Sequence, residues 1–222
     1  IGQQNAAGGA LLGLDRLYEG QEALCIHNPA TGREATLPHV VRPTSGRRLK
    51  AVVVGAGPAG LEAARVLAER GHRVVGFEAA DAAGGQIRLA ARVARRRELL
   101  GIVDWRLERA AEAGCVWHFN HLAEAADVLA EAPDLVVIAT GGLPNTDVVP
   151  GAGHAVSSWD VLAGDVAMGG RVLVYDDNAA HPALAAAELF AGAGAEVEIV
   201  TPERFFAADV GGLNHAAYAE VF

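Results

Sequence analysis

The sequence of 222 residues contains only two cysteines and no long apolar run, and both shortages exclude classes of protein. Cys25 and Cys115 are too few and too far apart for a disulfide framework or a zinc site, which favours a reducing setting. No run of about 18 uncharged apolar residues occurs, and no basic segment opens the N-terminus. We therefore expect a cytoplasmic protein that has no membrane partner.

Positive charge is also scarce. Lys and Arg number 18 against 27 Asp and Glu, a formal net charge of −9, so no nucleic-acid partner is expected. Hydrophobic residues make up 51%, which is enough for one large core or two small ones. The chain does not begin with Met and ends without a polar tail, so we expect a fragment of a longer protein.

Strand and helix patterns alternate from residue 49 onward. The expected strands are 49–55, 72–78, 115–119 and 134–140, and the expected helices are 58–71, which Gly71 closes, 94–113 and 123–130. Short connections between alternating elements require parallel pairing through right-handed crossovers. The expected fold class is therefore α/β, with a Rossmann-like doubly wound sheet.

A weaker copy of the first strand, helix and strand follows Pro150. Its strands are expected at 171–177 and 195–201, around a helix at 181–194. One such unit is about half of a complete small nucleotide-binding domain, so this second Rossmann-like subdomain is expected to be incomplete. The predicted organisation is a linker at 1–48 with a short helix near Leu11 to Tyr18, a dinucleotide-binding domain at 49–150, and a truncated subdomain at 151–222.

The run GAGPAG lies between the first strand and the first helix, which is the context that a dinucleotide fingerprint requires. Gly55 permits a tight turn, Gly57 allows backbone N–H groups to approach a pyrophosphate, and Gly60 lets the helix pack closely on the strand. Pro58 and Ala59 open the helix, whose positive end favours phosphate, and Pro58 costs no hydrogen bond there. We assign this run to cofactor binding.

Glu78 ends the second strand, where a carboxylate can accept hydrogen bonds from the ribose hydroxyls of adenosine. It would repel a 2′-phosphate, which favours FAD or NAD over NADP. A second glycine loop, Gly84 and Gly85, follows at short range, and Gln86 and Arg88 flank it. We predict that these residues also lie beside the cofactor.

Several segments together resemble the flavoprotein half of the family that contains trimethylamine dehydrogenase, histamine dehydrogenase and 2,4-dienoyl-CoA reductase. They are ALCIHNPATGRE, VVVGAGPAGLEAARVLAERGH, FEAADAAGGQIRLA, PDLVVIATGG and SSWDVLAGD with VLVYDDN. N-methylproline and dimethylglycine demethylase-like members are the most similar. The resemblance extends over essentially the whole chain.

The resemblance implies that different domains of the whole protein carry different cofactors. In the family an N-terminal barrel carries FMN and oxidises the substrate, an iron–sulfur cluster relays electrons, and the half seen here binds FAD, or ADP in its place. The two glycine loops and Glu78 match the family's nucleotide contacts, and Thr140 with Gly141 matches its ATG segment. The barrel is missing from this sequence. We therefore expect no catalytic residues here, and as partners FAD, the missing barrel and a protein electron acceptor.

The sequence departs from the family pattern at two places, and there the resemblance does not carry over. The family's cluster segment begins with a Cys-Ile-Gly-Cys-like run, whereas Ile1 and Gly2 are followed by Gln3, and Cys25 is the first cysteine. One thiolate cannot hold a four-iron cluster, so no metal site is expected. Cys25 is either a remnant ligand or a small buried hydrophobe.

The second departure lies in the tandem copy. There Tyr175, Asp177 and Ala180 replace the three glycines, and Thr201 stands where an acidic ribose ligand would be. A pyridine nucleotide would fit badly, which favours electron transfer to a protein or to oxygen. Alternatively, Asp176, Asp177 and Asn178 merely close a structural turn, which is the simpler account of these residues. Two alternatives stay open: part of an NADPH-dependent dienoyl-CoA reductase, and a structural module that holds ADP without redox chemistry.

Other polar and aromatic residues are assigned no function. His72, His118 and His121 lack metal-ligand spacing and are expected at the surface. The run Arg95 to Arg97 opens an amphipathic helix and is expected to be a solvated charge run. Trp105, Trp117 and Trp159 are expected to serve packing.

Overall fold

The protein is described by a computed structural model that covers residues 25–146, 151–210 and 212–222. The helix expected near Leu11 to Tyr18 lies outside these residues. The described chain divides into two compact units. The four-stranded unit comprises residues 38–91 and 97–142. The two-stranded unit comprises the described parts of 1–37, 92–96 and 143–222.

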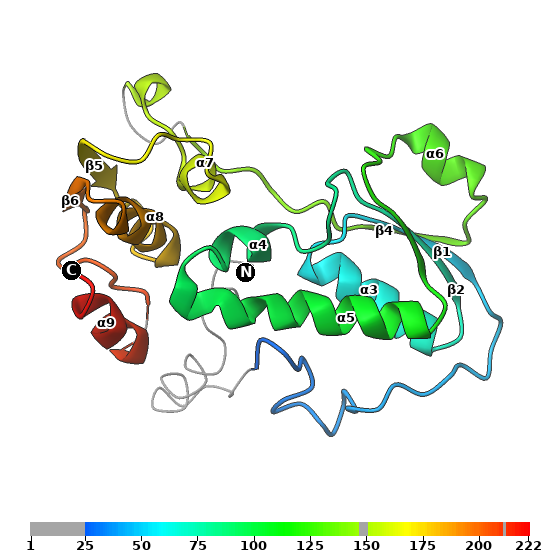
Figure 1. Cartoon of the computed structure of the whole chain (residues 1–222). Helices are drawn as coiled ribbons and strands as arrows, with labels where there is room; N and C mark the ends of the chain where they lie inside the picture. Colours follow the sequence, from blue (N-terminus) through cyan, green and yellow to red (C-terminus); the bar gives the residue numbers. More distant parts are fainter. Residues whose placement is uncertain (1–24, 147–150, 211) are drawn as a thin grey trace. The chain divides into compact units, whose positions relative to one another are not determined.

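The four-stranded unit is built on a parallel sheet with the strand order β3-β2-β1-β4. Its elements are β1 (Lys50–Val54), α3 (Pro58–Glu69), β2 (Arg73–Phe77), α4 (Gln86–Ala90), α5 (Leu100–Glu112), β3 (Val116–His118), α6 (Ala125–Ala130) and β4 (Leu135–Ile138). Figure 1 shows α3 and α5 running side by side along the sheet. The parallel α/β fold expected from the alternating pattern is confirmed.

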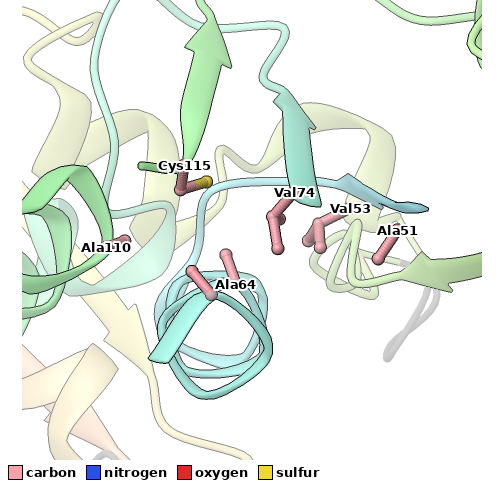
Figure 2. Close-up of a cluster of buried hydrophobic side chains, with 7 residues drawn as sticks. Ala51, Val53, Ala64, Val74, Ala110 and Cys115 are labelled. Carbon is pink, nitrogen blue, oxygen red and sulfur yellow. The ribbon is translucent and has the colours of Figure 1, made fainter. Parts of the chain in front are cut away.

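The core of this unit lies between β1, β2 and the two long helices. Ala51, Val53 and Val74 point from the strands toward Ala64 of α3, as Figure 2 shows. Small residues on the facing helices allow this close approach, since alanine adds little bulk between a helix and a sheet. Gly76 of β2 has a similar role, because an added Cβ would lie 2.2 Å from the Trp117 ring.

The two-stranded unit contains the tandem copy. Its elements are η2 (Ala152–His154), α7 (Ser158–Ala163), β5 (Arg171–Tyr175), α8 (His181–Gly192), β6 (Glu196–Val200) and α9 (Gly212–Ala219). β5 and β6 pair in parallel. The strands and the helix of the copy lie where the sequence pattern predicts them, whereas α4, α7 and α9 were not expected.

The helix expected at 94–113 is only partly correct. Residues Ala94–Leu99 form a 3₁₀ helix, η1, and α5 begins at Leu100. The expectation that Arg95 to Arg97 form a solvated charge run is wrong for Arg95 and Arg96. Arg95 forms an ion pair with Glu188 at 2.9 Å and lies over the Tyr218 ring at 3.9 Å, and Arg96 is buried. Arg95 and Arg96 belong to the two-stranded unit, whereas α5 belongs to the four-stranded unit.

The helices of the described residues are too short or too polar to cross a membrane.

Candidate functional site

The candidate site lies at the carboxyl edge of the four-stranded sheet, where β1 turns into α3. Gly55 has φ +100°, and an added Cβ would lie 2.4 Å from the Ala139 carbonyl oxygen. At Gly60 an added Cβ would lie 1.8 Å from the Gly55 oxygen. Both positions therefore require glycine for the turn to close and for α3 to reach the sheet.

Gly57 differs from these two glycines because the protein itself leaves room for a side chain there. No described atom lies within 4 Å of the position that its Cβ would take. Gly57 is the N-cap of α3 and has an extended conformation without a side-chain cap, and Pro58 follows it. The first N–H groups of α3, from the exposed Ala59 onward, thus face a space that an anion can enter.

Glu78 holds the turn from the neighbouring strand. One of its carboxylate oxygens accepts a hydrogen bond from the Ala56 amide at 2.6 Å, and the other accepts one from the Ala80 amide at 2.9 Å. A carboxylate has about four lone-pair sites, so each oxygen retains one for a further donor. The two hydroxyls of a ribose could donate hydrogen bonds to these remaining lone-pair sites of the Glu78 carboxylate.

The second glycine loop lies directly beside the first. The Gly84 amide donates to the Ala56 carbonyl oxygen at 2.8 Å, and an added Cβ on Gly85 would lie 3.4 Å from the Gly57 Cα atom. Gly84 has φ +128° and Gly85 has φ +48°. The two loops are therefore in contact, and glycine permits this close approach.

The flanking residues are placed differently from one another. Gln86 begins α4 and is exposed, and an added Cβ on Gly141 would lie 3.8 Å from its side-chain nitrogen. The Ala139 amide donates to Val54 at 2.8 Å, which carries Thr140 and Gly141 to the same edge of the sheet. Arg88 turns back instead, and its guanidinium donates to the Ala83 carbonyl oxygen at 3.3 Å.

Two histidines that the sequence pattern left at the surface also lie at this edge. The Glu78 amide donates to the His118 carbonyl oxygen at 2.9 Å, and the His121 amide donates to the Glu78 carbonyl oxygen at 2.9 Å. Both imidazoles lie near the Phe77 ring, at centroid distances of 5.3 Å and 4.9 Å. His118 ends β3 and His121 follows it, beside the strand that leads to Glu78, and this position was the signal that could have placed them here.

The two cysteines lie in different units. Cys115 is part of the core, and burial raises the pKa of its thiol to about 12, which keeps it protonated. Cys25 is half-buried and unpaired. Among the described residues no group of three or more His, Cys, Asp or Glu side chains is arranged to hold a metal ion.

Comparison with known proteins agrees with this geometry. Residues 53–114 match the NAD(P)-binding Rossmann-like domain. The chain is 54% identical over 211 residues to a probable N-methylproline demethylase of Rhizobium meliloti (strain 1021). The aligned region covers 95% of this chain and 31% of that protein. It is also 43% identical to the N,N-dimethylglycine/sarcosine dehydrogenase of Chromohalobacter salexigens, over 95% of this chain and 32% of that protein.

The chain is also similar in structure to a solved member of this group of enzymes. The chain is similar to histamine dehydrogenase from Rhizobium sp. 4-9, with a TM-score of 0.79 and 27% identity over 97% of this chain and 34% of that one. The chain is thus similar to one part of these longer dehydrogenases and demethylases. The resemblance drawn from the sequence is thereby confirmed, and the chain spans about a third of the length of the relatives that it matches.

Proposed function

We propose that this chain is the FAD-binding, electron-transfer part of a multidomain flavin oxidoreductase that acts on N-methylated amines or amino acids. The observation that carries the proposal is the open position of Gly57 between two glycine turns, at the N-terminus of a 12-residue helix. The pyrophosphate of a dinucleotide has the charge and the size for such a position.

The free lone pairs of Glu78 support adenosine as the group next to the pyrophosphate. Its carboxylate is already fixed by the Ala56 and Ala80 amides, so the oxygens are held in place before a ribose arrives. A 2′-phosphate would bring negative charge against this carboxylate, which disfavours NADP at this site. The adenine would then lie toward the end of β3, where His118 and His121 line the edge.

The proposed role of the chain is to bind FAD, and oxidation of the amine is assigned to another part of the protein. FAD, when bound, supplies the redox chemistry, and the protein positions it and shields it. We assign no residue of this chain to oxidation of the amine, a step that we attribute to an FMN-carrying barrel elsewhere in the whole protein. An iron–sulfur cluster between the two would need ligands beyond Cys25.

The test separates cofactor binding from folding. Gly57→Ala introduces a Cβ into open space at an ordinary φ of −69°, so the variant should unfold at the same temperature as wild type. The same Cβ would meet the cofactor, so the affinity for FAD should fall by at least about tenfold, equivalent to about 1.4 kcal/mol. Gly192→Ala, also in open space but far along α8, is the matched control and should bind FAD normally.

Thermal unfolding with excess FAD or ADP provides the readout, because a ligand that binds only the folded state raises the melting temperature. A larger rise with FAD than with ADP, together with flavin retained after desalting, supports electron transfer. A rise with ADP alone would favour a structural module instead. No rise with either nucleotide would refute the site.

A further inference from the structure

The unit β5-α8-β6 and the unit β1-α3-β2 share a hydrogen bond at the end of their first strand. In the first, the Gly55 amide donates to the carbonyl oxygen of the last β2 residue, Phe77, at 2.8 Å. In the second, the Asp176 amide donates to the carbonyl oxygen of the last β6 residue, Val200, also at 2.8 Å. The structure thus places Asp176, rather than Tyr175, at the position of Gly55.

Asp176 places a carboxylate under the turn where a nucleotide fold receives a pyrophosphate. Its side chain is almost fully buried, with 1% exposed, and neither carboxylate oxygen has a hydrogen-bond partner of normal geometry among the described residues. The carboxylates of Asp177 and Asp209 are close enough to act on it. Three acidic groups at this turn would repel the two negative charges of a pyrophosphate.

The chain also covers this turn with its own residues. The Asp209 amide donates to the Ala179 carbonyl oxygen at 3.0 Å, and Ala207 and Val210 are buried with Leu184 of α8. Tyr218 of α9 completes this cluster. At the corresponding turn of the four-stranded unit, no atom of the described residues outside the turn lies within 4 Å of the Cβ position of Gly57.

One amide at the N-terminus of α8 has a partner within the turn itself. The Ala180 amide, at the N-cap, donates to the Asn178 side-chain oxygen at 3.1 Å. Ala179 and Ala207 hold φ angles of +52° and +59°, which non-glycine residues rarely adopt, and both are buried. Packing around the turn therefore maintains a closed arrangement at some conformational cost.

We infer that Asp176 and the segment Ala207–Val210 form an internal plug that closes the two-stranded unit to pyridine nucleotides. NADH and NADPH then cannot deliver a hydride through this unit. Thr201 agrees with this, because it stands after β6 where Glu78 stands after β2, and its hydroxyl accepts a bond from the Glu203 amide at 3.2 Å. Reducing equivalents must reach a flavin on this chain from another donor.

The plug can be tested in protein saturated with FAD, because the turn at Gly57 is then filled and cannot take up NADH. Equilibrium dialysis against NADH or NADPH should show no nucleotide retained beyond a control without protein. Nucleotide retained in proportion to the protein would overturn the inference. FAD uptake is read separately from visible absorbance, so its failure would count against the proposed function and not against the plug.

A variant pair tests which group closes the turn. Asp176→Gly combined with Asp177→Gly removes the buried carboxylate, whereas Asp177→Gly alone leaves it in place. The double variant should retain about tenfold more NADH or NADPH than the single variant. If the double variant retains its circular dichroism spectrum and cooperative melting, yet binds no more nucleotide than the single variant, the plug assignment to Asp176 is wrong.

Discussion

The Glu78 carboxylate accepts a hydrogen bond of 2.6 Å from the amide of Ala56, a residue 22 positions earlier and inside the glycine turn. This bond joins the end of β2 to the loop between β1 and α3. The same side chain is the proposed ribose ligand. The shape of the loop and the proposed binding of ribose therefore involve the same carboxylate, so a change at Glu78 should affect both.

We predict that Glu78→Gln lowers both stability and affinity for FAD. The amide can still accept one bond but loses the charge, and charge-assisted hydrogen bonds contribute roughly 1 kcal/mol more than neutral ones. The affinity for FAD should fall by about tenfold, measured by fluorescence titration, and the melting temperature without ligand should fall as well.

Glu112→Gln is the control for this substitution. Glu112 pairs with Arg109, and both side chains are about half exposed, so the loss of this pair should change stability by less than about 0.5 kcal/mol. A Glu78→Gln protein that binds FAD as tightly as the control would show that this carboxylate does not contact the cofactor.

A second prediction concerns Gly60, where the neighbour of an added Cβ is backbone and cannot rotate away. Gly60→Ala should destabilise the fold by about 3 kcal/mol, because α3 must move away from β1 to accommodate the methyl group. Urea unfolding measures this change. Gly57→Ala, in open space, is the comparison, and equal stability of the two variants would contradict the geometry of the turn.

The sequence sufficed to predict the four-stranded unit because each of its signals is local. The run GAGPAG is flanked by an apolar strand and an amphipathic helix, and the turn geometry at Gly55 and Gly60 is dictated by residues within or beside that run. Parallel pairing follows from alternation alone. Glu78 was found from its distance along the chain, 23 residues after Gly55, which places it at the end of the next strand.

What the sequence could not show depends on contacts between distant residues. Arg95 looked like part of a solvated charge run because its partners, Glu188 and Tyr218, lie about a hundred residues later. His121 is partly exposed, as expected, but its contacts with Phe77 and Glu78 could not be predicted because these neighbours lie far away in the sequence. The correspondence of Asp176 to Gly55 appeared only with the register of β5 and β6.

A third prediction concerns Glu62, which lies on α3 and bridges two buried arginines. It pairs with Arg65 at 2.6 Å and with Arg106 of α5 at 2.8 Å. Burial would raise the pKa of Glu62, but the hydrogen bonds and charges of the two arginines outweigh it and lower the pKa below its usual value. Glu62→Gln should therefore cost about 3 kcal/mol at neutral pH, because it leaves Arg106 without this counter-charge.

The pH dependence of this loss has a definite sign. Because the pKa of Glu62 is lower in the folded state, its contribution is complete above the unfolded value, near 4.3, and is lost as the pH falls through the folded value. The stability gap between wild type and Glu62→Gln should thus shrink as the solution is acidified below about pH 4. A gap that stays constant down to unfolding would show that Glu62 acts through packing and not through its charge.

The last prediction concerns Asp176 and has the opposite sign. Burial raises the pKa of this carboxyl, and the charges of Asp177 and Asp209 act in the same direction, while the nearby amides of Asn178 and Ala179 only partly oppose them. The folded state therefore disfavours the ionised form, so Asp176 lowers stability increasingly as the pH rises above the unfolded value, near 3.9.

Asp176→Asn should accordingly stabilise the protein by about 1 to 3 kcal/mol at neutral pH, because an amide of the same shape carries no buried charge. The gain should disappear below about pH 4, where the wild-type carboxyl is protonated in both states. Asp177→Asn, at an exposed position beside it, is the control and should change stability little.

Asp176→Asn leaves a polar side chain under the turn. This variant should therefore gain stability without gaining the binding of NADH that removal of the side chain is expected to produce. Stability that does not rise in Asp176→Asn at neutral pH would mean that the buried carboxylate has found a partner, and that the plug is held closed by that bond.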